Sequence, residues 1–308
     1  MARGGDQPKP ETNLPVELTL LALLALLWGS SYVLIKVAVE TIPPVTLIAG
    51  RVTLAAAFLI AVMGISGERL PRDARTWRML FIQAVLNSIG AWTVLAWGQQ
   101  YVDSGLASVL NSTSPIFVFF ITFFFTRHEA TGGIRLLGAC LGVLGVTLIV
   151  GTDVLKGLGQ QVVAQLAVLL GAVLYAGAAI YGKRFSHLAP TVTAAGTMIW
   201  ASACLVPLSL ATEQPWTLRP SVLSLAAALV LAVLCTGVAL LIYFRLVRTL
   251  GSMGVASQAY LRSGVGVLLG VVLLGETISP VVGLGLVAAV LGVAAINMPP
   301  RRGSERKT

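Results

Sequence analysis

Three basic residues, Lys36, Arg51 and Arg262, interrupt stretches of the chain that are otherwise almost entirely apolar. Arg262 lies near the middle of the apolar run 254–274, and no Asp or Glu lies at a comparable depth in any such run. A guanidinium group in apolar surroundings pairs strongly, and often bidentately, with a carboxylate. Arg262 is therefore a candidate for binding an anionic group of a substrate.

Each of these cations also has a structural interpretation. Arg262 could cap helix carbonyls or reach Glu276, and Arg51 could contact loop carbonyls or Glu40. Lys36 could extend its ammonium group to the lipid headgroups. The functional alternative for Lys36 and Arg51 is a cationic path that continues toward the outer side of a membrane.

Aromatic and polar side chains in the same runs could supply the rest of a binding site. Ring faces provide apolar walls, while indole N–H and phenol O–H groups orient a ligand. Amide groups would cost free energy if they faced lipid, so we expect them to face protein or water. Helix packing is the alternative for the rings, and hydrogen bonding between helices is the alternative for the amides. The predicted substrate-binding residues are Arg262, Trp28, Tyr32, Trp92, Tyr175, Tyr260, Asn111 and Gln258.

The composition places these residues in a lipid bilayer. Of the 308 residues, 56% are hydrophobic and only 11% are charged, which is too apolar for a soluble globular chain of this size. We predict an all-α membrane protein with ten transmembrane helices, because ten apolar runs are long enough to cross a bilayer as helices. The predicted spans are 16–37, 44–64, 79–101, 105–126, 134–151, 163–183, 191–211, 222–244, 254–274 and 280–298.

The distribution of Lys and Arg predicts the orientation of these spans. If both termini are cytoplasmic, sixteen of the 21 cations lie in cytoplasmic segments, and only Lys156 and Arg219 lie in outer loops. Positive charge is enriched on the cytoplasmic side of membrane proteins. The sequence therefore predicts a plasma-membrane protein with both termini in the cytoplasm.

The chain repeats itself at an offset of 147 residues. Residues 129–149 match residues 276–296, and the same offset pairs Trp28 with Tyr175 and Gly90 with Gly237. Each copy holds five spans, an odd number, so the two copies must cross the membrane in opposite directions as inverted repeats. The predicted domains are a cytoplasmic tail 1–15, a first five-helix repeat 16–151, a second repeat 152–298 and a basic cytoplasmic tail 299–308.

Small and acidic residues recur at equivalent places in the two copies. Glycines in the runs 134–151 and 280–298 predict close helix packing, with a homodimer face as the alternative. Glu129 and Glu276 each precede the last run of a copy, so we expect them to cap the following helix, with proton coupling as the alternative. The Cys and His residues are isolated, so neither a metal site nor a cofactor is predicted.

Several stretches together resemble the EamA-type transporters of the drug/metabolite transporter superfamily. They are the run from Trp28 to Tyr32 with Lys36, the stretch from Thr113 to Glu129, Tyr260-Leu261, the following GVLLGVVLLGE ending at Glu276, and the glycine-rich fifth and tenth runs. The resemblance covers residues 16–298 and implies two inverted five-helix halves that export or exchange amino acids, nucleobases or other small metabolites. This chain departs from the family pattern at Arg262-Ser263, where an apolar residue followed by proline is usual.

The sequence predicts a secondary transporter, an exporter or exchanger of a small metabolite such as an amino acid or another carboxylate-bearing compound. Alternating access between the two inverted repeats would carry the solute across. The chain has no HExxH, GxSxG or P-loop motif, which disfavours an enzyme or an ATP-driven pump. A membrane-embedded sensor or assembly protein without transport activity is the alternative. The expected partners are a small-molecule substrate and lipid, without nucleic acid.

Overall fold

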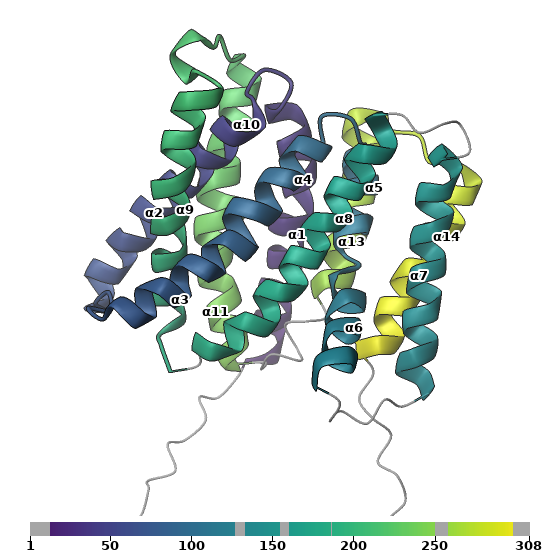
Figure 1. Cartoon of the computed structure of the whole chain (residues 1–308), viewed down its shortest axis with the longest axis horizontal. Coiled ribbons are helices and arrows are strands. Elements are labelled where there is room, and N and C mark those ends of the chain that lie inside the picture. Colours follow the sequence, from purple (N-terminus) through teal and green to yellow (C-terminus); the bar gives the residue numbers. More distant parts are fainter. Residues whose placement is uncertain (1–12, 127–132, 155–159, 186, 250–257, 298–308) are drawn as a thin grey trace, which may run out of the picture.

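The computed structural model describes residues 13–126, 133–154, 160–185, 187–249 and 258–297, and every regular element among them is helical, as predicted (Figure 1). The first elements along the chain are α1 (Leu14–Ala38), α2 (Pro44–Ser66), α3 (Ala74–Ala84), η1 (Val85–Ala91), α4 (Trp92–Gly98), α5 (Ser104–Asn111), α6 (Ser114–Thr126) and α7 (Gly133–Val154). The remaining elements are α8 (Gln160–Gly182), η2 (Lys183–Phe185), α9 (Pro190–Thr212), η3 (Pro215–Thr217), α10 (Val222–Ala232), η4 (Val233–Val238), α11 (Ala239–Thr249), α13 (Gln258–Leu274) and α14 (Pro280–Asn297).

Among the described residues, seven helical stretches are long and apolar enough to cross a membrane, which makes the chain a multi-pass membrane protein. They are Leu14–Ala38, Pro44–Ser66, Ala74–Gly98, Ser104–Thr122, Gln160–Phe185, Pro190–Thr212 and Val222–Tyr243. Three shorter apolar segments, Leu136–Leu148, Leu261–Leu274 and Pro280–Gly292, coincide with the other predicted spans.

Local sequence signals explain where several helices begin. Pro44 and Pro190 occupy the first turns of α2 and α9, where a missing backbone N–H costs nothing. Asp73 begins α3 by accepting a hydrogen bond from the Thr76 N–H at 2.7 Å. Ser221 caps α10 in the same way through the Ser224 N–H at 3.0 Å.

Two π-helical stretches interrupt the third and eighth predicted spans at equivalent positions. They are η1 and η4, and they contain Gly90 and Gly237, which the 147-residue offset relates. In η4, the Thr236 hydroxyl donates to the carbonyl of Leu231, five residues earlier, at 2.9 Å. An added Cβ at Gly237 would lie 2.6 Å from Phe58 of α2, so glycine allows the close approach there. Such local widening of a helix is common at functional sites.

Helices at equivalent positions pack against each other in two pairs, α7 with α14 and α2 with α9, which stand on opposite sides of the molecule in Figure 1. A Cβ built on Gly292 of α14 would lie 2.5 Å from the Gly142 nitrogen and 2.6 Å from the Gly138 oxygen of α7. The glycine-rich faces therefore pack within the chain, as the small residues predicted. A homodimer interface on those faces is not supported.

Two glutamates from the second half of the chain cap helices in the first half. Glu276 accepts backbone hydrogen bonds from Ser104 at 2.6 Å and Gly105 at 2.9 Å, at the start of α5. Glu213 accepts from the Val45 and Thr46 N–H groups at 3.1 and 2.6 Å, at the start of α2. A carboxylate at a helix N-terminus satisfies unpaired donors and opposes the helix dipole.

The predicted role of Glu276 was therefore right in kind but wrong in target. Glu276 caps α5 from a distant part of the sequence. The following helix, α14, is capped by Ser279, whose hydroxyl accepts a hydrogen bond from the Val282 N–H at 3.3 Å. Glu129, its counterpart in the first copy, lies outside the described residues.

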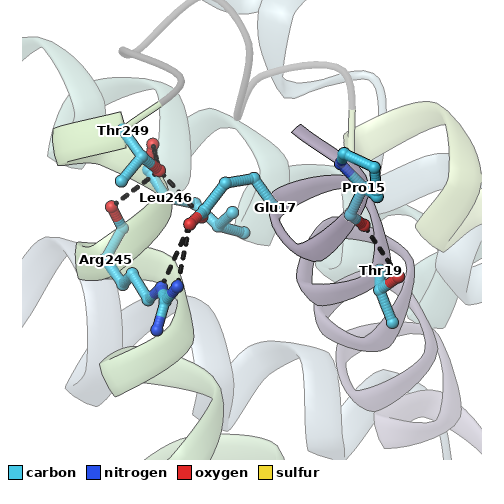
Figure 2. Close-up of polar contacts among 6 residues, drawn as sticks. All are labelled: Pro15, Glu17, Thr19, Arg245, Leu246 and Thr249. Carbon is cyan, nitrogen blue, oxygen red and sulfur yellow. Dashed lines mark hydrogen bonds and ion pairs between the residues drawn. The ribbon is translucent and has the colours of Figure 1, made fainter. Parts of the chain in front are cut away.

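An ion pair joins α1 to α11, as Figure 2 shows. Oε1 of Glu17, whose side chain is buried, lies 2.9 Å from Nη2 of Arg245, and the Thr249 hydroxyl donates to Oε2 of Glu17 at 2.9 Å. The Arg245 side chain is largely exposed, so this pair lies at the edge of the helix packing.

Candidate functional site

Arg51 of α2 is the centre of a buried polar cluster. Its side chain is only 6% exposed. Nε of Arg51 donates to the Thr236 hydroxyl of η4 at 2.8 Å, and the guanidinium carbon lies 4.0 Å from the centre of the Trp92 ring of α4. The guanidinium group thus rests on an aromatic face, a favourable arrangement for a desolvated cation. The expected contact of Arg51 with Glu40 or loop carbonyls is absent from the described structure.

No described acidic residue neutralises the charge of Arg51. Its hydrogen bond goes to a neutral hydroxyl, and its electrostatic neighbours are Tyr175, Cys235 and Tyr32. The Nη atoms make no hydrogen bond to the described residues. A buried cation without a counter-ion is costly, because its lost hydration is not replaced. The site is therefore suited to receive an anion.

Tyr175 of α8 lies in the same part of the molecule as Arg51 of α2 and Arg262 of α13. Tyr175 packs against the buried core that contains Trp92, and Arg51 and Arg262 both lie near enough to act electrostatically on its phenol group. The predicted residues Trp92, Tyr175 and Arg262 are thus brought to one region, which we call the Arg51 cluster together with Arg51 and Thr236. The helices that carry Trp92, Tyr175 and Arg262 lie in the middle of the molecule in Figure 1.

Arg262 also lacks an internal counter-ion in the part of the chain that the structure describes. Its Nε atom is buried and has no hydrogen-bond partner. Glu276, considered as its partner, is instead occupied by the N-terminus of α5. The backbone of Arg262 packs closely on α1, because its carbonyl oxygen would lie 2.9 Å from a Cβ added to Gly29.

Tyr32, Asn111 and Gln99 form a second buried group, the Tyr32 network. The Asn111 amide donates to the Tyr32 hydroxyl at 2.8 Å, and the Gln99 amide donates to the Tyr32 carbonyl at 2.7 Å. Oδ1 of Asn111 and Oε1 of Gln99 are buried acceptors without a partner among the described residues. Tyr32 belongs to the same buried core as Trp92, and Tyr175 packs against that core, so the network adjoins the Arg51 cluster.

The other predicted residues do not join this region in the described structure. Trp28 packs against Tyr243 of α11, with ring centres 5.4 Å apart, in a separate apolar cluster. Lys36 is half-buried and donates to the Val102 carbonyl at 3.0 Å, in the turn between α4 and α5. The side chains of Gln258 and Tyr260 lie outside the described part of the chain.

The sequence favours a structural contact for Arg51, and it predicts neither Thr236 nor Gln99 for this region. The signal for Arg51 was the one used for Arg262, namely a cation within an apolar run with no acid at the same depth. Thr236 carried no such signal, because its contact with Arg51 joins residues 185 positions apart.

Comparison with known proteins gives consistent matches over nearly the whole chain. The EamA-like transporter family matches residues 16–151 and, a second time, residues 162–298. The inner membrane transporter YedA of Escherichia coli is 28% identical over 287 residues, covering 92% of this chain and 91% of that protein. The transporter YoaV of Bacillus subtilis is 30% identical over 166 residues, covering 54% and 56% of the two chains.

Two further comparisons bear on function and fold. A protein of Streptantibioticus cattleyicolor named "Probable terminal-alkyne amino-acid exporter" is 25% identical over 288 residues, covering 93% of this chain and 94% of that protein. One solved crystal structure superposes with a TM-score of 0.64 at 17% identity, covering 92% of this chain and 97% of the other, so the two share a fold.

Proposed function

Because the chain belongs to the EamA-like transporter family of the drug/metabolite transporter superfamily, we propose that it is a secondary transporter of a small carboxylate-bearing metabolite, such as an amino acid. Two inverted five-helix repeats, residues 16–151 and 152–298, alternate between inward-open and outward-open arrangements in the cytoplasmic membrane. Both termini face the cytoplasm, and the protein acts as an exporter or exchanger.

The observation that carries the substrate class is the uncompensated charge of Arg51. A guanidinium that is 6% exposed, stacked on Trp92 and without an acidic neighbour among the described residues needs an anion from elsewhere. The substrate carboxylate supplies it through the unbonded Nη atoms. Binding then replaces the hydration that the guanidinium group lost on burial. Because Arg51 is already desolvated in the folded protein, the substrate does not have to displace water from it on binding, which favours affinity.

The neutral groups around Arg51 orient the rest of the substrate. Trp92 and Tyr175 provide ring faces beside the carboxylate, and Oδ1 of Asn111 is an unpartnered acceptor for an ammonium or hydroxyl group. An amino acid presents both a carboxylate and an ammonium group. The name of the Streptantibioticus relative, which mentions an amino-acid exporter, supports this substrate class.

The arrangement of the helices supports alternating access. The family matches the chain twice, and the equivalent helices α2 and α9, and α7 and α14, pack against each other as pairs. Arg51 contacts Thr236 across the two matched segments, so its cluster lies between units that would move relative to each other.

Purified protein in proteoliposomes tests the proposal, because only a transporter moves solute without any other component. Amino acids and organic acids are offered to the wild type, Arg51→Gln and the matched control Arg219→Gln, which changes a loop arginine outside the cluster. A hydrogen bond to a charged group contributes about 1.5 to 3 kcal/mol, so Arg51→Gln is expected to lower the apparent affinity roughly ten- to hundredfold.

Two results would contradict the proposal. Equal carboxylate transport by the wild type and Arg51→Gln would remove Arg51 from the site. Failure of the wild type to move any carboxylate-bearing compound, in either direction, would favour the alternative of a sensor or assembly protein.

A further inference from the structure

We propose that Glu276 is the gate residue of the interface between α5 and α13, and that these two helices separate at the Glu276 end when the protein opens toward that side of the membrane. The inference rests on the proposed function only for its two alternating arrangements. It makes Glu276 a positioning residue of the transport cycle, because its carboxylate holds a moving helix and does not touch the substrate.

The first step is that Glu276 closes one end of the α5–α13 interface. Its carboxylate oxygens accept hydrogen bonds from the Ser104 and Gly105 N–H groups at 2.6 and 2.9 Å. Gly270 of α13 leaves the space for this carboxylate, because an added Cβ there would clash with Oε2 of Glu276 and would lie 2.8 Å from Oγ of Ser104. Glu276 and α5 belong to different segments matched by the EamA-like family, so the contact joins the two repeats.

The second step is that two hydroxyl groups buried at this interface have no hydrogen-bond partner among the described residues. They are Oγ of Ser104 on α5, whose residue is fully buried, and Oγ of Ser263 on α13, whose residue is 1% exposed. Ser263 lies at the interface because its carbonyl accepts from the Ser108 hydroxyl at 3.1 Å. Buried polar groups in a permanent interface are almost always hydrogen-bonded. The unpaired hydroxyls therefore favour an interface that water reaches in another arrangement of the helices.

The α2–α9 interface, which also joins the two matched segments, has the opposite character. The hydroxyl oxygens of Thr46 and Ser209 lie 2.7 Å apart. Those of Thr53 and Ser202, further along the same helices, also lie 2.7 Å apart. Glu213 caps the start of α2 within this interface. Because the hydroxyl groups here pair with each other, nothing indicates that this interface opens, and its cap offers a matched control for the proposed gate residue.

The third step is that the α5–α13 interface leads from Glu276 to the Tyr32 network. Gly266 of α13 packs against both neighbours, because a Cβ there would lie 2.5 Å from Cβ of Ser108 and 3.5 Å from Cδ2 of Tyr32. The Tyr32 network adjoins the Arg51 cluster. Separation of α5 from α13 would thus open the proposed substrate site toward the membrane side on which the gate lies, the outer side in the proposed orientation.

The fourth step is that α5 has a hinge at its other end. The helix breaks after Asn111, because Pro115 has no N–H to give to the Asn111 carbonyl, which accepts from the Ser114 hydroxyl at 2.9 Å instead. Beyond the break the partners change: α5 packs against α13, whereas α6, which lies below α5 in Figure 1, packs mainly against α8 and α14. The break allows α5 to tilt away from α13 while α6 keeps its own contacts.

The test measures the distance across the gate by double electron–electron resonance. Spin labels are attached to Tyr101→Cys, just before α5, and to Ile278→Cys, just after Glu276, in a chain whose native cysteines are replaced by alanine. Both native side chains are 39% exposed, so the labels do not disturb the core. The measurement is made in lipid nanodiscs without any solute.

We expect the wild type to show mainly one short distance. Glu276→Gln keeps the size of the side chain but removes its charge and one acceptor, and should raise the ratio of long to short distances about tenfold. Gly270→Ala displaces the Glu276 carboxylate by direct contact and should act in the same direction. Glu213→Gln should leave the distances as in the wild type. Both glutamine variants should unfold at a lower temperature, because each loses a helix cap, so the distance separates gating from stability.

Two outcomes would overturn the proposal. An unchanged distance distribution in Glu276→Gln would show that the interface stays closed without its cap, and Gly270→Ala takes the place of this variant if Glu276→Gln does not fold. An equal shift in Glu213→Gln would show general loosening of the molecule. Because no solute is present, failure of carboxylate uptake in proteoliposomes would refute the substrate class and leave this test unaffected.

Discussion

Replacing Gly292 with alanine should push α14 away from α7. A Cβ at that position would lie 2.5 Å from the Gly142 nitrogen, 2.6 Å from the Gly138 oxygen and 2.8 Å from the Gly142 Cα, whereas ordinary contact begins at 3.4 Å. These neighbours are backbone atoms that cannot rotate away. The two helices must therefore separate by about 1 Å, which forfeits a quarter to a half of the dispersion energy of the atom pairs involved.

The expected cost follows from this separation. Overpacking of a close helix contact typically lowers the free energy of unfolding by about 1 to 3 kcal/mol, and the backbone location of the clash places Gly292→Ala at the upper end. Gly145→Ala meets the same pair of helices, with Ala289 nitrogen at 2.5 Å and Gly285 oxygen at 2.7 Å. Because either substitution separates the helices, the double variant should lose less than the sum of the two.

Unfolding in mixed detergent and SDS micelles, followed by circular dichroism, measures these differences. Gly64→Ala in α2 is the matched control, because no atom lies within 4 Å of the place its new Cβ would occupy, and its stability should equal or slightly exceed that of the wild type. If Gly292→Ala unfolded at the same SDS fraction as Gly64→Ala, the close α7–α14 contact would be refuted.

Three further predictions concern the polar contacts. Glu276→Ala removes two charge-assisted hydrogen bonds at the start of α5 and should lower the free energy of unfolding by about 2 to 4 kcal/mol, with Glu276→Gln in between, as SDS titration would show. Arg245→Gln leaves the buried Glu17 carboxylate without its cation and should lower the thermal unfolding temperature. Adding Glu17→Gln to the same chain should restore part of that temperature, because it removes the unpaired charge. Hydrogen bonds from the side chain and backbone of Thr76 hold the pKa of Asp73 below its ordinary value of 3.8. The stability that Asp73 contributes is therefore present above pH 3.8 and is lost as the pH falls through the lower pKa of the folded state. Asp73→Asn should reduce the acid sensitivity of unfolding.

The positions of the helices were largely readable from the sequence, because apolar runs and prolines mark them directly. The run 44–64 corresponds to α2, Pro44–Ser66, and the run 191–211 corresponds to α9, Pro190–Thr212. The third run was placed at 79–101, but α3 begins at Ala74, since the Asp73 cap extends the helix into a polar turn that hydropathy excludes. The π-helical stretches were not predicted, because a wider turn has no distinct composition.

The site was predictable only in part, because contacts between distant segments leave no local pattern in the sequence. An unpaired arginine in an apolar run is visible in the sequence, and Arg262 was identified in that way. The neighbours of such an arginine are determined by how distant helices pack, as the Arg51–Thr236 contact illustrates. Trp28 and Tyr175 occupy equivalent positions at the 147-residue offset, yet Trp28 packs on Tyr243 in one apolar cluster and Tyr175 packs on another, the core that contains Trp92.

The capping of α2 and α5 by Glu213 and Glu276 has a consequence for biogenesis. Both helices are synthesised well before the glutamates that complete them, since 167 residues separate Thr46 from Glu213 and 172 separate Ser104 from Glu276. Until then their first N–H groups must rely on water or lipid headgroups at the membrane surface. In a ribosome-bound fragment that ends before residue 213, α2 and α5 would therefore be less stable than in the finished protein. Stable packing of the first half of the polypeptide thus depends on residues that are synthesised in the second half.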